Sequence, residues 1–280
     1  LVSRDFVGPA GLQADEGGHD GNRPGDDGQQ AIATQFAIGS PHNDSSKGRA
    51  EIKNFNSLSS QQWSENLDSL PENFCEVVLT NPPFGARIGV RDTEILRQYD
   101  LGHQWTETNS KDGWSRTRAL QGSQDPQILF LERCVRLLKP GGRLGIVLPE
   151  GVFGNRQQGY VWNWLLTKGR ISALLDCPRT TFQPGTDTKT NVLFFERANA
   201  ERPSGTDGDE QPTRIAVALH CGHDRRGRAH LGNGRPFPDD FARLGPQYHA
   251  DQGINSGWRK VELGATDYFV PRYFAEQRPL

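Results

Sequence analysis

Residues 81–85, Asn-Pro-Pro-Phe-Gly, carry the strongest chemical signal in the sequence. Asn81 contributes a carboxamide oxygen, the two prolines contribute carbonyl oxygens on rigid tertiary amides, and Phe84 contributes an aromatic face. Acceptors aimed at the N–H groups of a planar amine, with a ring stacked on its face, are suited to binding that amine. The alternative interpretation is a strand-terminating turn whose Phe84 ring belongs to the core.

An apolar run, Val77–Thr80, precedes this motif and predicts a buried strand. Two consecutive prolines end such a strand, because proline has no N–H donor and a fixed φ. Asn81 stands before a proline and is therefore expected to be extended. Open α/β sheets bind ligands at the carboxyl ends of their strands. We therefore expect residues 81–85 to lie at a ligand-binding edge.

Helices and strands are expected to alternate after this motif. Asp125 is a predicted N-cap and Pro126 the first residue of a helix that ends before Pro140-Gly141-Gly142. A second helix is predicted at 159–168, and strands at 144–148, 171–176, 191–195 and 214–219. The alternation predicts an α/β fold with a Rossmann-like, doubly wound, mainly parallel sheet. A loop joins the last two strands, so we expect them to form an antiparallel hairpin at the sheet edge.

The remaining segments have weaker patterns. Residues 8–28 are rich in Gly, Asp and Asn, which favours a loop, and Gly8–Gly11 is a weak cofactor-loop candidate because no strand precedes it. Residues 51–55 predict a short strand and residues 60–70 a polar helix. Residues 86–125 form a long polar and aromatic segment, interpreted either as a substrate-contacting lid or as a solvated surface loop.

Composition limits the classes of function. The net charge is −2, the pI is about 6.4 and the mean hydropathy is −0.69, which is unlike a self-sufficient nucleic-acid binder. No apolar run is long enough for a membrane span, which predicts a cytoplasmic protein without membrane partners. The four cysteines are far apart and lack metal-ligand spacing, so we predict buried thiols and no metal. The chain starts at Leu1 and contains no methionine, and we expect it to be part of a longer protein.

Several segments in combination resemble one family. They are Asn81–Gly85, Phe130–Glu132, Leu137–Arg143, Ile146–Gly151 and Thr181–Phe195, within residues 52–200. This combination is similar to the N6-adenine DNA methyltransferases, and most of all to the modification (M) subunits of type I restriction-modification systems and their fused type II relatives. Gly222–Gly227 is similar to that family as well.

The resemblance implies transfer of a methyl group from S-adenosyl-L-methionine to N6 of adenine in DNA. It assigns catalysis to Asn81, Pro82, Pro83 and Phe84, with Asn81 Oδ1 and the Pro82 carbonyl accepting the two hydrogens of the amine. Phe84 stacks on the extruded base, and Phe182 is a second candidate for stacking or, equally, a core or loop aromatic. The cofactor-binding residues remain unassigned, with Asn81 adjacent to the cofactor.

The resemblance also predicts the domain organisation. Residues 1–50 are an irregular segment, residues 51–200 a catalytic core incomplete at its N-terminus, and residues 201–280 an extension toward a target-recognition region. The implied partners are DNA, a specificity subunit or fused recognition domain, and a restriction subunit, in a prokaryotic cytoplasm. Because no cofactor loop is recognisable, we expect the 280 residues alone not to methylate DNA.

The sequence is compatible with more than one function. The chain is either a methyltransferase for DNA, a methyltransferase for RNA or protein glutamine, or an inactive Rossmann-like scaffold that holds a specificity subunit. The arginines Arg225, Arg226 and Arg228 either contact phosphates or belong to a solvated loop. The spacing of His220, Cys221 and His223 is too irregular for a metal site.

Overall fold

The computed structural model describes residues 72–82, 89–108, 113–199, 212–249, 257–263 and 269–276, together with two short strands. The short strands are β1 (Phe36–Ala37) and β2 (Ile52–Lys53), which pair antiparallel. The strand expected at 51–55 is therefore confirmed in its centre. The polar helix expected at 60–70 and the glycine cluster Gly8–Gly11 lie outside the described residues.

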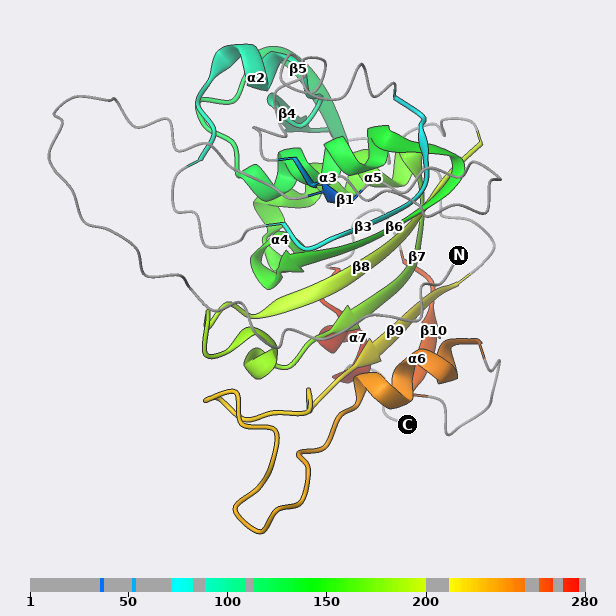
Figure 1. Cartoon of the computed structure of the whole chain (residues 1–280). Helices are drawn as coiled ribbons and strands as arrows, with labels where there is room; N and C mark the ends of the chain where they lie inside the picture. The colour runs from blue at the N-terminus through cyan, green and yellow to red at the C-terminus, as the bar shows by residue number, and fades with distance from the viewer. Residues whose placement is uncertain are drawn as a thin grey trace, which may run out of the picture. The chain divides into compact units, whose positions relative to one another are not determined.

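A six-stranded mixed sheet forms the centre of the described structure, with the strand order β10-β9-β7-β8-β6-β3 (Figure 1). Its strands are β3 (Cys75–Thr80), β6 (Leu138–Pro149), β7 (Gly169–Asp176), β8 (Thr190–Arg197), β9 (Thr213–Val217) and β10 (Trp258–Val261). The pairs β3–β6 and β7–β9 are parallel, whereas β8 is antiparallel to both β6 and β7, and β10 is antiparallel to β9. The predicted α/β class is confirmed, but the sheet is mixed rather than mainly parallel, because three of its five strand pairs are antiparallel.

Helices flank this sheet, and the longest of them was predicted from its caps. Helix α3 (Pro126–Leu137) starts after Asp125, whose side chain accepts a hydrogen bond from the Gln127 N–H at 3.1 Å. Helix α5 (Gly159–Lys168) has the predicted bounds. The shorter helices are α2 (Thr93–Arg97), α4 (Glu150–Gly154), η1 (Arg156–Gln158), η2 (Arg179–Phe182), α6 (Phe241–His249) and α7 (Pro271–Glu276).

Alternate residues of the strands pack into two apolar layers, as the period of a strand requires. Leu193 and Phe195 of β8 belong to the larger core cluster, which includes side chains of α3, α5 and the residues before α7. Val192 and Phe194 of the same strand pack on the other side, with Leu244 of α6. The sheet therefore has helices on both of its faces.

The position of β8 corrects one prediction. We expected the strands at 191–195 and 214–219 to form an antiparallel hairpin at the edge, but β8 lies between β6 and β7. Leu193 and Phe195 are buried and Val192 and Phe194 are partly buried, and β8 pairs with both neighbours. A central position suits this continuous apolar run better than an edge does, because an edge strand leaves one row of backbone groups unpaired.

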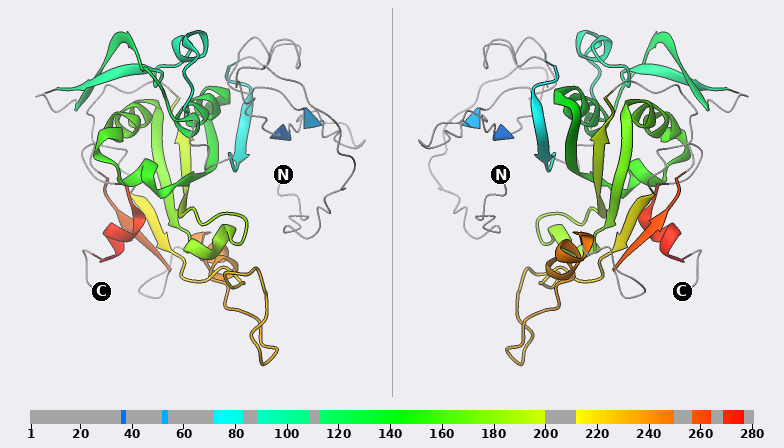
Figure 2. Two further views of the ribbon diagram at one scale, coloured as in Figure 1. Left: turned by 90° about the vertical axis from the view of Figure 1, so that its left-hand side faces the viewer. Right: turned by 90° about the vertical axis from the view of Figure 1, so that its right-hand side faces the viewer.

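The exposure of strand β3 corrects the prediction that this strand is buried. The run Val77–Thr80 does form a strand, but only Val78 of it is buried, and Val77 and Leu79 are 48% and 75% exposed. Within the described residues β3 pairs with β6 alone and is the last strand of the sheet (Figure 2).

The described residues of the segment 86–125, which are 89–108 and 113–125, form regular structure rather than a solvated loop. It contains α2 and an antiparallel hairpin of β4 (His103–Glu107) and β5 (Trp114–Leu120). The buried carboxylate of Glu132 in α3 accepts the backbone N–H groups of Asp100 at 2.8 Å and Leu101 at 2.7 Å, and pairs with Arg136. Burial raises the pKa of Glu132, and the Arg136 guanidinium opposes that rise. This carboxylate fastens the segment to the core.

Among the described residues, no helix is long and apolar enough to cross a membrane.

All four cysteines are free thiols. The predicted burial is confirmed for Cys134, and this burial raises the pKa of its thiol to about 12. Cys75 is only partly buried.

Replacing Glu132 by Gln is expected to lower the free energy of unfolding by about 1–3 kcal/mol, since an amide cannot accept from both backbone N–H groups. Urea denaturation measures the change. Glu94→Gln is the matched control, because Glu94 forms an exposed ion pair with Arg97, whose loss should cost less than about 0.5 kcal/mol. Equal effects of the two substitutions would contradict the anchoring role of Glu132.

Candidate functional site

Four strands of the sheet run in the same direction. Because β8 is antiparallel to both β6 and β7, these two are parallel to each other, and β3 and β9 follow them. The residues Leu148, Asn191, Asp176 and Val217 stand in register across β6, β8, β7 and β9. We call this side of the sheet, where β3, β6, β7 and β9 end and β8 begins, the carboxyl edge. It is the side at which open α/β sheets bind ligands.

The first two residues of the predicted motif lie at this edge. Asn81 follows β3 directly and is exposed, whereas Pro82 is buried. Thr80, the last residue of β3, is in register with Ile146, two residues before Leu148. Pro83 and Phe84 lie outside the described residues, so their predicted roles remain predictions.

The loop of residues 177–189, which we call the β7–β8 loop, leaves and re-enters the sheet at the same edge. It contains η2 and the half-buried Phe182, whose carbonyl accepts the Thr186 N–H at 3.0 Å. Only β6 separates β3 from β8, so these strands lie about two strand spacings, or roughly 10 Å, apart, and β3 ends level with Leu193, three residues after the start of β8. The loop with Phe182 and the strand end with Asn81 therefore belong to one edge.

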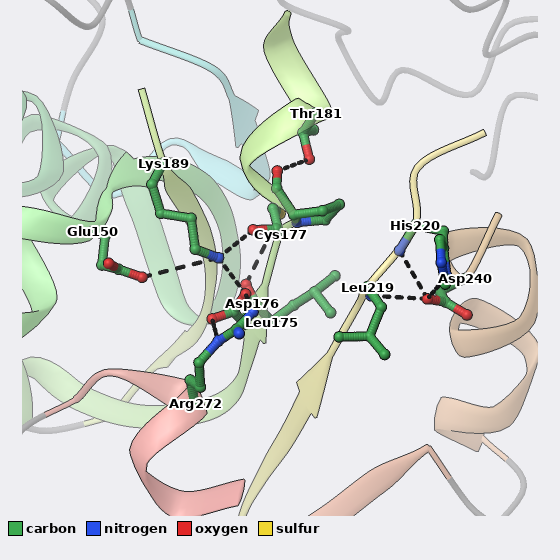
Figure 3. A network of polar contacts seen from close by, with 11 residues as sticks. Glu150, Leu175, Asp176, Cys177, Thr181, Lys189, Leu219, His220, Asp240 and Arg272 are labelled. Carbon is green, nitrogen blue, oxygen red and sulfur yellow. Dashed lines mark hydrogen bonds and ion pairs between the residues drawn. The ribbon is translucent and has the colours of Figure 1, made fainter. Parts of the chain in front are cut away.

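An ionic cluster around one buried carboxylate closes the base of this loop (Figure 3). Asp176, the last residue of β7, is fully buried, and the Lys189 ammonium donates to its Oδ1 and to the Cys177 carbonyl. The Arg272 guanidinium of α7 lies 3.3 Å and 3.4 Å from the two carboxylate oxygens. Glu150 Oε2 is 3.9 Å from Lys189 Nζ. One carboxylate thus joins both ends of the β7–β8 loop to α7.

The interior of the loop offers no activated thiol. Burial raises the pKa of Cys177 to about 12, which keeps its sulfur protonated at neutral pH. The Thr181 hydroxyl donates to the Pro178 carbonyl at 2.6 Å and so folds the start of η2 back on itself. These contacts serve the shape of the loop rather than covalent catalysis.

Asn191 is a buried polar residue that the sequence analysis did not single out as a candidate. Its side chain is fully buried at the start of β8, and neither its amide oxygen nor its amide nitrogen has a hydrogen-bond partner in the described part of the chain. Leaving such a group unpaired costs about 1–3 kcal/mol. The only signal in the sequence is an asparagine at the head of an apolar strand. Asp176 and Lys189 were likewise given no role, because 13 positions separate them.

The carboxyl edge has the chemistry of a hydrogen-bond acceptor site. No group of three or more His, Cys, Asp and Glu side chains in the described residues is arranged to hold a metal ion. Asn81 and Pro82 bring a side-chain carboxamide and the carbonyl of a tertiary amide, neither of which titrates near neutral pH. Such acceptors are suited to a neutral amine, and the roles assigned to Asn81 and Pro82 from the motif remain predictions.

The family of this chain follows from a comparison with known protein families. The N-6 DNA Methylase family matches residues 42–211, more than half of the chain. The chain belongs to the N-6 DNA Methylase family. The matched region includes β3, Asn81, the β7–β8 loop and β8.

Curated relatives are M subunits. The methylase subunit of the Escherichia coli type I restriction enzyme EcoEI is 27% identical over 150 residues, which cover 52% of this chain and 25% of that subunit. The corresponding subunit of EcoKI from Escherichia coli strain K12 is 27% identical over 138 residues, 49% of this chain and 21% of that subunit. The chain thus spans about a quarter of the length of these relatives.

Solved structures of the same kind show a more distant similarity. The type I restriction-modification methyltransferase subunit from Streptococcus thermophilus has a TM-score of 0.46 at 18% identity, covering 71% of this chain and 37% of that one.

We expect Lys189→Met to lower the free energy of unfolding by about 3 kcal/mol, because it leaves the buried Asp176 carboxylate without its main partner. Adding Asp176→Leu should restore part of the loss, since Arg272 is partly solvated and the unpaired buried charge is gone. Thermal and urea denaturation measure both variants.

Lys139→Met is the matched control for this pair. Lys139 forms an exposed ion pair with Glu76, whose loss should cost less than about 1 kcal/mol. A double variant that is less stable than Lys189→Met alone would argue against the proposed charge pairing.

Proposed function

We propose that this chain is the catalytic part of an adenine-specific DNA methyltransferase, which transfers a methyl group from S-adenosyl-L-methionine to N6 of adenine. One observation carries the proposal. Within a chain of the N-6 DNA Methylase family, the Asn81-Pro82 pair follows β3 at the carboxyl edge, with the side chain of Asn81 exposed to an incoming base.

The reaction requires hydrogen-bond acceptors beside the amine rather than a general base. The lone pair of the exocyclic amine is delocalised into the adenine ring, so positive charge develops on the nitrogen as it attacks the methyl carbon. Asn81 Oδ1 and the Pro82 carbonyl accept the two amine hydrogens and stabilise that charge more in the transition state than in the ground state. The bond between the methyl carbon and the sulfonium sulfur of the donor would break as the N–C bond forms, which leaves the donor as a neutral thioether. The positively charged methylated amine would then lose one proton to water, so no ionised residue has to stand beside the amine.

The target adenine must leave the double helix to reach this edge. In the proposal Phe84 stacks on one face of the extruded base, and Pro83 keeps the turn rigid between the acceptors and the ring. Phe182 is proposed for the opposite face. Its place in the β7–β8 loop, at the same edge as Asn81, supports this role.

S-adenosyl-L-methionine supplies the electrophilic methyl group. The acceptor set at the end of β3 fits a place beside such a donor, because Asn81 and Pro82 are uncharged and do not compete with the amine for the methyl group. The residues that bind the ribose and the methionine part of the cofactor stay unassigned. The proposed partners are those implied by type I M subunits, namely DNA, a specificity subunit or fused recognition domain, and a restriction subunit.

Asn81→Ala in the full-length protein is expected to reduce adenine methylation at least about a hundredfold, because it removes one of the two acceptors on the amine. Transfer of tritiated methyl groups to DNA measures the activity. Asn199→Ala is the matched control, an exposed asparagine beyond the end of β8 and so at the opposite edge of the sheet. Near-normal activity of Asn81→Ala would remove this residue from the mechanism.

Phe84→Ala should weaken extrusion of the target base, whereas Phe84→Trp should retain part of it, because stacking needs an aromatic face and not a particular ring. The fluorescence of 2-aminopurine at the target position reports extrusion directly. An unchanged signal in Phe84→Ala would assign the ring a structural role.

A further inference from the structure

An arm of residues 218–240 leaves the carboxyl end of β9 and returns to α6. It forms a narrow loop that is crossed by isolated bridges between Cys221 and Asp239 and between His230 and Pro236. Asp240 Oδ2 holds its base by accepting the Leu219 N–H at 2.8 Å and the His220 N–H at 3.0 Å (Figure 3). Figure 2 shows the arm, in orange, extending away from the strands.

The first turn of the arm, residues 223–228, is built around one carboxylate, and we call it the basic turn. Asp224 accepts hydrogen bonds from the Arg226 N–H at 2.8 Å, the Arg228 N–H at 2.9 Å and Arg228 Nε at 2.8 Å. Gly227 closes the turn with a φ of +75°, which favours glycine. The bonds from Arg228 lower the pKa of Asp224 to about 2, so its carboxylate is ionised at neutral pH.

The charges of the basic turn do not cancel. Asp224 forms an ion pair with Arg228 at 2.6 Å, which leaves the guanidinium groups of Arg225 and Arg226. Both side chains are exposed and neither forms an ion pair or a side-chain hydrogen bond in the described part of the chain. A turn fixed by its own hydrogen bonds therefore presents two positive charges to solvent, on a protein whose net charge is −2.

The basic turn lies beside the β7–β8 loop. The Thr180 hydroxyl is 3.2 Å from the Cys221 sulfur, and a side-chain carbon added to Gly227 would lie 3.3 Å from Pro184 Cδ. The hydrogen bond between Thr180 and Cys221 joins the arm to the β7–β8 loop just before the basic turn, and the space beside Gly227 shows that the turn itself lies close to that loop.

We propose that Arg225 and Arg226 bind backbone phosphates of DNA next to the target adenine, an inference that rests on the proposed function. A base that reaches the β7–β8 loop brings its flanking phosphates to the same part of the surface. Guanidinium groups bind phosphate oxygens through two parallel hydrogen bonds, and neutralising a phosphate contributes affinity without reading sequence. A protein with a net negative charge needs such local positive sites to bind DNA.

The salt dependence of DNA binding by the full-length protein tests this inference. Each phosphate contact contributes about 0.9 to the slope of log K against log salt concentration, so Arg225→Ala and Arg226→Ala should each reduce the slope by about 0.9 and the double variant by about 1.8. Losses should be similar for cognate and non-cognate duplexes. In methylation assays the KM for DNA should rise several-fold, with kcat within about twofold of wild type.

Arg143→Ala provides the matched control, because Arg143 is also exposed but lies in β6 at the residue that pairs with Val77, away from the carboxyl edge. A slope that falls equally in Arg143→Ala would indicate a general effect of charge and overturn the inference. An unchanged slope in the Arg225→Ala/Arg226→Ala variant would overturn it as well.

Neutral methylphosphonates locate the contact on DNA. Placed on either side of the target adenine, they should weaken binding of the wild type but have little further effect on the double variant, since both changes remove the same interaction. Additive losses would place the two arginines elsewhere on DNA and contradict the proposal. If the wild type binds DNA but methylates no adenine, the proposed function fails. The salt-dependence slopes and the methylphosphonate experiment would still decide whether the basic turn binds phosphates.

Discussion

The insertion of antiparallel β8 between β6 and β7 is the constraint on which the rest of this structure depends. It forces the chain to leave β7 and enter β8 at the same edge, so that the β7–β8 loop lies where β3 ends with Asn81. It also places the start of β8, with its buried Asn191, next to the end of β7. A hairpin of β8 and β9 at the sheet edge would have separated these features.

Buried carboxylates and their partners then hold together the segments that the strand order brings close. Asp176 has no exposed surface, and a carboxylate in that setting must be paired, which Lys189 and Arg272 accomplish from the end of the β7–β8 loop and from α7. Glu132 acts similarly in α3, where it satisfies two backbone N–H groups of the segment before β4. In both places one buried carboxylate joins segments that are distant in the sequence. Removing its partner would leave a buried charge unpaired, which is strongly destabilising.

The proposed chemistry and the charge distribution are consistent with each other. In the proposed mechanism Asn81 and Pro82 act as hydrogen-bond acceptors and no titrating side chain is needed, so an acidic net charge would not interfere with it. Positive charge would be needed only where DNA lies, and in the proposal the basic turn supplies it locally through Arg225 and Arg226. Asp224 neutralises Arg228 and gives the turn its shape, which separates the structural arginine from the two that remain available.

The sequence by itself determined the features that depend on neighbouring residues. The caps of α3, the bounds of α5, the apolar runs of β6 to β9 and the contiguous Asn-Pro-Pro motif all follow from local propensities within a few positions, and the family resemblance rests on the same short segments. Tertiary structure alone decided the order of the strands, the exposure of Val77 and Leu79, and the pairing of Asp176 with Arg272, 96 positions away. The physical reason is that pairing and burial depend on which distant segments meet, and a one-dimensional pattern of apolar residues does not specify the neighbour of each strand.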